Sequence, residues 1–285
     1  MTTKAEQKRI RGEYLVAEAD ALNCIDRAII NRHVDIPEIL AGRLRDELLF
    51  MKRELSDPHY NELLTAAIWL VCIIIFPLIP IPLRIKKKRE EERFLIAEKN
   101  ERIKKDNDDT RKIIAALNDG DSKAMQSFTR KVIAAYGGIG GYETKFQWSV
   151  ADDGRSMAIT MFLPNETELP QYTHIARKTT EEIIRKKKKD KELHQNHSIL
   201  VHSTALRVAA ACFSIMPTIA NIDCDVYTKR RNKANGQLED ESILRVVFNR
   251  SRWETIDFAH IDPIAVYENF SATRTIGKNG ALIKI

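Results

Sequence analysis

Cysteine is scarce in this 285-residue sequence, which holds four widely separated cysteines: Cys24, Cys72, Cys212 and Cys224. None of them forms a Cys-x-x-Cys pair, so the spacing indicates neither a thiolate metal site nor a disulfide framework. This usage is typical of a reducing compartment such as the cytoplasm. The pattern of a cleavable secretion signal is also missing, because the first long apolar run begins only at Leu63.

Signatures of enzyme chemistry are missing as well. The glycine-rich loop at 137–141 follows a predicted helix and lacks Gly-Lys-Ser/Thr, so we expect a connection and not a phosphate loop. His194, His197 and His202 lie at spacings of three and five on one predicted helix, which do not converge well on a metal. Ser203 lies in the middle of that helix, unlike a nucleophile on a strained turn. We therefore expect no catalytic residue, no metal and no cofactor.

One tripeptide, Glu143-Thr144-Lys145, fits the Glu-x-Lys pattern that places a carboxylate and an ammonium on the same side of a strand. A nuclease would also need an aspartate from a preceding strand, and here Asp119 and Asp121 precede it in a predicted turn. The pattern therefore favours surface charges on an edge hairpin over a metal-dependent nuclease site.

Residues 63–83, "LLTAAIWLVCIIIFPLIPIPL", form an apolar run of 21 uncharged residues. A helix over 63–76 covers about 21 Å and an extended remainder adds about 20 Å, enough for a hydrocarbon core of about 30 Å. Prolines break the helical ladder, and extended backbone in lipid needs other protein around it. A re-entrant or interfacial segment, and a buried helix in a soluble core, therefore stay open beside a membrane span. The residues expected to contact the membrane are Leu63, Trp69, Ile74, Phe76, Pro77 and Leu83.

The charge around this run predicts an orientation. Residues 44–63 carry three lysines and arginines and residues 84–103 carry eight, which places the C-terminal part in the cytoplasm. The net charge of +6 also favours anionic partners. Contacts with anionic lipid or phosphate are expected from Lys86, Lys87, Lys88 and Arg89. A single span would put the N-terminal 62 residues outside, and because they are themselves basic, this supports the re-entrant alternative.

The sequence predicts an α+β chain of four segments. These are an N-terminal helical segment (1–62), a transmembrane or re-entrant segment (63–83), a charged helical stalk or short coiled coil (84–117) and a cytoplasmic α+β domain (118–285). In the last segment, hairpins around 152–154 and 229–240 should form one small antiparallel sheet. A long helix from about Thr180 to Ile215 should pack on the face of this sheet.

Two cationic clusters occur in the last segment, at 185–191 and 229–233. If they lie near each other, they form a face that binds nucleic acid phosphates with a strong dependence on salt. Few aromatic residues accompany them, so base stacking is not indicated. Anionic lipid, or simply a solvated helix face and a loop tip, are the alternatives. The candidate nucleic-acid contacts are Arg185, Lys186, Lys187, Lys188, Lys189, Lys229, Arg230 and Arg231.

Three stretches, "HSTALRVAAACF", "NGQLEDESILRVVFN" and "DFAHIDPIAVYENF", follow a predicted hairpin in this order. Together they resemble the domain upstream of the nuclease in bacterial Mrr-type restriction endonuclease proteins, over roughly residues 117–270. The firmest points of the resemblance are Ala205, Leu206, Arg207, Phe213, Asp262 and Pro263. The nuclease itself is not expected, because only a short stretch follows Phe270. The resemblance implies a non-catalytic sensor, adaptor or scaffold in a bacterial defence system against phage.

Three functions follow as hypotheses. The first is a membrane-anchored, non-catalytic component of an anti-phage defence assembly at the bacterial inner membrane, working as a homo-oligomer or with a protein partner. The second is an oligomeric effector that disrupts the membrane by forming a pore. The third is a membrane-tethered protein that binds nucleic acid.

Overall fold

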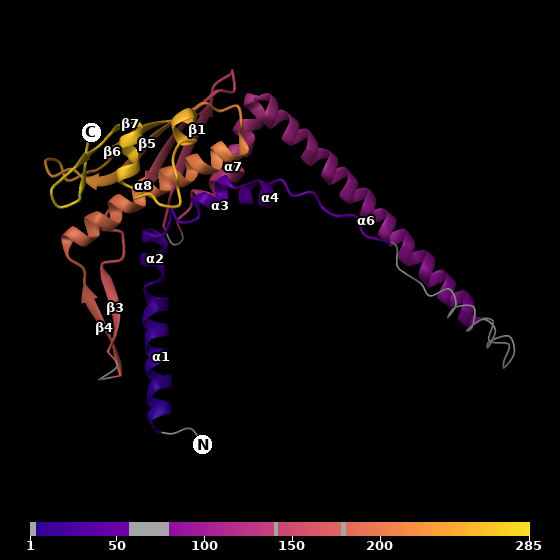
Figure 1. Cartoon of the computed structure of the whole chain (residues 1–285), viewed down its shortest axis with the longest axis horizontal. Helices are drawn as coiled ribbons and strands as arrows, with labels where there is room; N and C mark the ends of the chain where they lie inside the picture. The colour runs from indigo at the N-terminus through magenta and orange to yellow at the C-terminus, as the bar shows by residue number, and fades with distance from the viewer. Residues whose placement is uncertain (1–3, 57–79, 140–141, 178–180) are drawn as a thin grey trace. The chain divides into compact units, whose positions relative to one another are not determined.

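The computed structural model describes residues 4–56, 80–139, 142–177 and 181–285 (Figure 1). The chain forms two compact units, one of Met1–Leu48 with Ala116–Ile285 and one of Leu49–Ala115. The first unit begins with the helices α1 (Lys4–Leu22), α2 (Cys24–Ile30), α3 (Ile36–Leu40) and α4 (Arg43–Leu48). It continues with α7 (Ser122–Tyr136), α8 (Asp190–Ile215), α9 (Arg250–Trp253) and the short 3-10 helix η1 (Ala265–Asn269).

A five-stranded sheet in the order β1-β2-β5-β6-β7 organises the first unit. Its strands are β1 (Lys145–Val150), β2 (Ser156–Leu163), β5 (Asn221–Arg231), β6 (Leu238–Asn249) and β7 (Ser271–Thr273), and a small pair of β8 (Thr275–Ile276) and β9 (Leu282–Ile283) follows. The expected hairpins β1–β2 and β5–β6 are both present, and the α+β class is confirmed. The two hairpins join through a parallel pairing of β2 with β5, so the sheet is mixed at that junction. The pairing is parallel because α8 carries the chain back across the sheet between them.

The core lies between the sheet and α8. Alternate β2 residues Met157, Ile159, Met161 and Leu163 are buried, and α7 and α8 cover this face of the sheet (Figure 1). By length and composition, α8 could cross a membrane, and 83% of its most apolar window is buried inside the unit. Since the sheet and neighbouring helices surround it, α8 acts here as the central core helix.

A hairpin replaces the first third of the helix expected from Thr180. Strand β3 (Tyr172–Arg177) pairs with β4 (Glu182–Lys187), and α8 begins only at Asp190. The β-branched Ile184 lies opposite Ile175 in this pair, and α1 packs against β3. The cations of 185–189 hide this short strand pattern, which is why a helical interpretation was wrong for residues 182–187.

The N-terminal helices belong to the same unit as residues 116–285. Buried Arg32 donates from Nη2 to the carbonyls of Tyr136, Gly137 and Gly138, each at 2.9 Å, and so caps the C-terminal end of α7. A Cβ atom at Gly137 would lie 2.8 Å from the Phe146 ring, so the backbone packs closely at this residue, whereas a Cβ atom at Gly138 would have nothing within 4 Å. The compact unit therefore differs from the expected division after residue 62, because long-range ion pairs and caps tie the first 48 residues to it.

The helix α6 (Pro80–Asp119) has 40 residues and contains the expected stalk, and its residues up to Ala115 belong to the second unit. Pro80 and Pro82, expected in extended chain, lie in its first turn, where the missing N–H groups have no helical partner to lose. Leu83 lies in this first turn as well. The other residues expected to contact the membrane fall outside the described residues: Leu63, Trp69, Ile74, Phe76 and Pro77.

Candidate membrane-binding site

The described flank of the apolar run is the cationic beginning of α6. Lys86, Lys87 and Lys88 are exposed within the first three turns of the helix. Arg89 is half-buried and interacts with a neighbouring group. Lysines placed this close to an apolar run can reach the phosphates at the surface of a bilayer.

Two large apolar side chains follow these lysines. Phe94 is 69% exposed and Leu95 is 53% exposed, and together with Lys87, Glu90 and Glu91 they line a shallow hollow on α6. Sequence reasoning missed these two residues, although an adjacent aromatic and leucine inside a charged helix are a recognisable signal. Such a mixture of cations and exposed apolar residues is suited to the interface of a bilayer.

The second described flank is a segment, residues 52–55, that two asparagines hold against α6. Asn107 accepts from the Lys52 amide at 2.9 Å and donates to its carbonyl at 2.9 Å. Asn100 pairs in the same way with Leu55, at 2.8 and 2.9 Å. From Lys52 to Leu55 the extended chain advances about 10 Å, and from Asn100 to Asn107 the helix advances about 10.5 Å. The two asparagines are therefore spaced to reach their two partners. The segment therefore runs antiparallel to α6, towards the end at which the helix begins.

An ion pair accompanies this asparagine ladder. Lys52 Nζ lies 2.6 Å from an Asp106 carboxylate oxygen, and the hydrogen bond from Lys52 lowers the pKa of Asp106. Both side chains are more than half exposed, so the ion pair adds little stability. The two asparagines, which bind both peptide groups of their partners, set the register of the segment.

The eight candidate nucleic-acid contacts are divided among different roles. Lys188 is only 6% exposed, pairs with Asp26 of α2 and donates to the Pro170 carbonyl at 2.8 Å. Arg185 stacks over the Tyr172 ring at 3.6 Å. Lys186, Lys187 and Lys189 stay exposed and line a pocket of about 190 Å³. Lys188 also borders this pocket, but its ion pair with Asp26 neutralises its charge, so the basic surface depends on the three exposed lysines.

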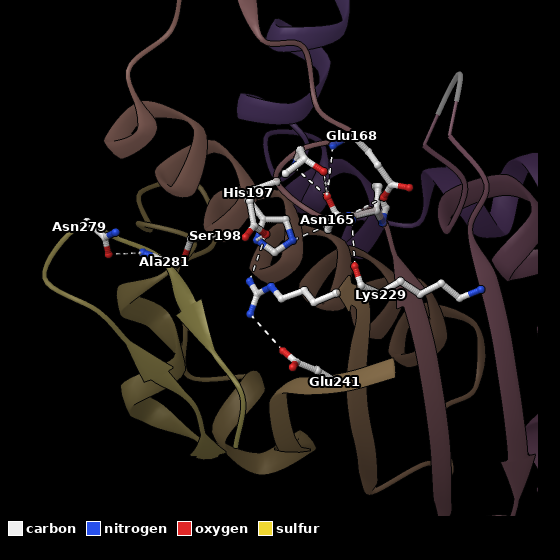
Figure 2. A network of polar contacts seen from close by, with 12 residues as sticks. Asn165, Glu168, His197, Ser198, Lys229, Glu241, Asn279 and Ala281 are labelled. Atoms are coloured by element: carbon white, nitrogen blue, oxygen red, sulfur yellow. Dashed lines mark hydrogen bonds and ion pairs between the residues drawn. The ribbon is translucent and has the colours of Figure 1, made fainter. Parts of the chain in front are cut away.

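The β5–β6 tip loses one cation in the same way. Arg230 is half-buried and reaches Glu166 at 3.1 Å and Glu241 at 3.6 Å, whereas Lys229 stays exposed. Figure 2 shows this network, in which Asn165 also donates to the Lys229 carbonyl at 2.8 Å. Arg231 donates to the Gly236 carbonyl within the tip.

Two of the three histidines of α8, His197 and His202, are buried and hydrogen-bonded. His197 is buried and donates from Nε2 to the Pro164 carbonyl at 3.1 Å (Figure 2), and burial lowers its pKa to about 4. The Nδ1 atom of His202 lies 2.7 Å from the Ser198 carbonyl oxygen, and its Nε2 atom accepts a hydrogen bond from Arg274. Burial lowers the pKa of His202 to about 4 as well, so both rings are neutral at pH 7.

Glu166 lies beside this network. Burial acts to raise the pKa of Glu166, but a backbone N–H, the charge of Arg230 and, once it is protonated at low pH, the charge of His197 outweigh it, so the pKa lies below its usual value. A carboxylate is the form that Arg230 needs for its ion pair. The network therefore fixes the loop after β2 to the β5–β6 hairpin.

Glu143 and Lys145 pair with each other at 3.1 Å and are both well exposed. With Glu168, Lys229 and Asp240 they line a pocket of about 270 Å³ at the end of the sheet. Across the described ranges, no group of three or more histidine, cysteine or acidic side chains could hold a metal ion. The pair has the form of surface charges at the edge hairpin.

The residues that carry the family resemblance lie in the core and at a turn. Ala205 and Leu206 are buried in α8, Arg207 pairs with Asp35 and stacks over Tyr136 at 5.0 Å, and Phe213 contacts Trp253. Asp262, which precedes Pro263, accepts from the amides of Ile264 and Ala265. No family model, curated protein or solved structure matches this chain. The resemblance therefore stays a prediction.

Proposed function

We propose that the protein is a membrane-anchored, non-catalytic scaffold or sensor, whose apolar run 63–83 enters and leaves the bilayer on the same, cytoplasmic side. The observation that carries this proposal is the shared compact unit of Met1–Leu48 and Ala116–Ile285. A single crossing would put these two stretches on opposite sides of the membrane, and they could then not pack together.

The energy of separating them argues against a single crossing. Without residues 1–48, Lys188 would lose Asp26, and the carbonyls at the end of α7 would lose Arg32. Breaking one buried ion pair alone costs about 3–5 kcal/mol. The asparagine ladder adds support, because it holds residues 52–55 along α6 and so keeps both flanks of the run within the second unit.

The chemistry of α6 suits attachment to an anionic leaflet. Each lysine near such a surface contributes about 1 kcal/mol, and Phe94 and Leu95 add apolar contacts. Stable anchoring generally needs two such signals together, and an apolar run with a cationic flank supplies both. In the proposed assembly, a defence complex of bacteria as the resemblance implies, the first unit binds the protein partner or further copies.

Flotation of the full chain with lipid vesicles tests this proposal. After removal of detergent, the protein should float with phosphatidylcholine vesicles, and more tightly when phosphatidylglycerol is added. The triple variant Lys86→Ala/Lys87→Ala/Lys88→Ala should lose most of the preference for the anionic lipid. Protein that stays at the bottom of the gradient with both vesicles would contradict anchoring. Release of a trapped dye would instead support the pore-forming effector.

A further inference from the structure

A cavity of about 470 Å³ lies between α7 and the edge strand β1. Its size is within the range of small-molecule sites. The side chains that define its chemistry are Lys123, Gln126, Ser127, Arg130, Trp148 and Ser149. Sequence reasoning did not single out this group, because it joins residues of a helix to residues of a strand some twenty positions away.

The cavity is cationic without internal neutralisation. Lys123 and Arg130 are seven residues apart on α7 and so lie on one face of the helix, with Ser127 between them. Both are exposed, no acidic residue lines the cavity, and neither cation has a carboxylate partner in the part of the chain that the structure describes. Two unpaired cations beside hydroxyl groups are suited to a phosphate.

The aromatic wall of the cavity is fixed in position. The Trp148 indole donates to the Gln126 backbone carbonyl at 3.0 Å, and the Gln126 side chain donates to the Trp148 carbonyl at 3.0 Å. The same side chain accepts from the Val150 amide at 3.1 Å, so it also covers the free edge of β1. The ring is therefore held against α7 before any ligand arrives, which lowers the entropy cost of binding.

We propose that this cavity binds a nucleotide, with the phosphate between Lys123 and Arg130 and the base against the Trp148 ring. Stacking of a base on an aromatic side chain is tolerant of sequence and contributes about 1–3 kcal/mol. The nucleotide can come from a free mononucleotide or from a single-stranded nucleic acid. The site shares no residues with the membrane-binding surface or with the cationic tracts at 185–189 and 229–231. A negative result for membrane anchoring would therefore leave the nucleotide proposal standing, and a negative result for nucleotide binding would leave membrane anchoring standing.

Tryptophan fluorescence of the full chain in detergent micelles tests the proposal. Trp69→Phe serves as the background, and Trp253 is buried, so quenching reports on Trp148. ATP and a single-stranded oligothymidine are the two probes. Saturable quenching by either supports the site, and comparison of the two identifies the source of the nucleotide.

Variants decide whether this quenching comes from the proposed cavity. Lys123→Ala and Arg130→Ala should each weaken binding about ten-fold, as expected for loss of a charge-assisted contact. For the oligonucleotide, each should also lower the log–log salt slope by about 0.7. Lys131→Ala is the matched control, because Lys131 is exposed on the same helix and does not line the cavity. Absence of quenching with both probes, or equal losses in Lys131→Ala and Lys123→Ala, would overturn the proposal.

Discussion

Among the run of cations at 185–189, Lys188 has a role that its neighbours do not share, because it is buried in an ion pair with Asp26. Lys188→Met leaves Asp26 buried without its partner and should lower the free energy of unfolding by about 3–5 kcal/mol. Lys187→Met, at an exposed position, should change it by less than about 0.5 kcal/mol. Urea denaturation measures both.

A double variant separates the ion pair from general packing. Asp26→Leu/Lys188→Met removes both charges, and it should recover much of the stability that Lys188→Met loses. A Lys188→Met protein as stable as Lys187→Met would show that this pair does not hold α2 to the rest of the unit.

His202 makes stability depend on pH. Burial lowers its folded-state pKa from 6.5 to about 4, so the unfolded chain binds more protons between these values. Its contribution, about 3 kcal/mol for a shift of this size, is complete above pH 6.5 and is lost as the pH falls towards 4. In His202→Asn, stability at pH 7 should be lower and should fall less between pH 6.5 and 4. Urea denaturation at a series of pH values checks this, and equal slopes in the two proteins would contradict it.

Single residues were the hardest level to predict from sequence. Lys188 cannot be distinguished from Lys187 by composition, since its burial depends on Asp26, 162 positions away. The positions of His197 and His202 depend on partners far along the chain, Pro164 and Arg274, which the spacing of the histidines on α8 does not reveal. The α7–β1 cavity could not be predicted, because its cations and its tryptophan come from elements whose packing the sequence does not reveal.

At the scale of elements, the asparagine ladder of α6 is the feature most open to a test. Asn100→Ala and Asn107→Ala each remove two hydrogen bonds to the segment 52–55 but raise the helix propensity of α6. Each should speed amide exchange at its partner, Leu55 or Lys52, about ten-fold. Lys104→Ala, at an exposed position of the same helix, is the control.

Hydrogen exchange resolved to single amides measures this effect. The loss should be local, so the amide at the other rung of the ladder should change less than the one whose asparagine is replaced. Unchanged amide exchange at both Lys52 and Leu55 in the double variant Asn100→Ala/Asn107→Ala would show that the ladder does not hold the segment.

Most elements could be predicted from the sequence. The amphipathic and charged patterns indicated α6 and α7, and alternating residues around a tight turn and around a polar loop indicated the hairpins β1–β2 and β5–β6. The hairpin β3–β4 was missed because its few apolar residues, such as Ile175 and Ile184, lie among cations. The parallel pairing of β2 with β5 could not be read locally, because it depends on the path of α8 across the sheet.

At the scale of the whole molecule, the fold changes how the apolar run 63–83 is interpreted. The sequence left a single span and a re-entrant segment open, and charge counting by itself left the N-terminal residues outside. Packing of Met1–Leu48 with Ala116–Ile285 supports the re-entrant alternative. This packing uses Arg32, Asp35 and Asp26, whose partners lie about a hundred residues or more away, so no local pattern announces it.

Labelling with a membrane-impermeant maleimide tests this central claim most directly. Cys24 is exposed and reports on the N-terminal stretch, and Lys233→Cys, at the exposed β5–β6 tip, reports on the C-terminal part in a Cys24→Ser background. Both proteins also carry Cys72→Ser. Buried Cys212 and Cys224 should not react with the maleimide, since burial raises the pKa of Cys212 to about 12 and that of Cys224 well above its usual value.

If both flanks are cytoplasmic, neither reporter reacts in intact spheroplasts and both react once the membrane is permeabilised. Reaction of Cys24 in intact spheroplasts, with Lys233→Cys still protected, would contradict the account.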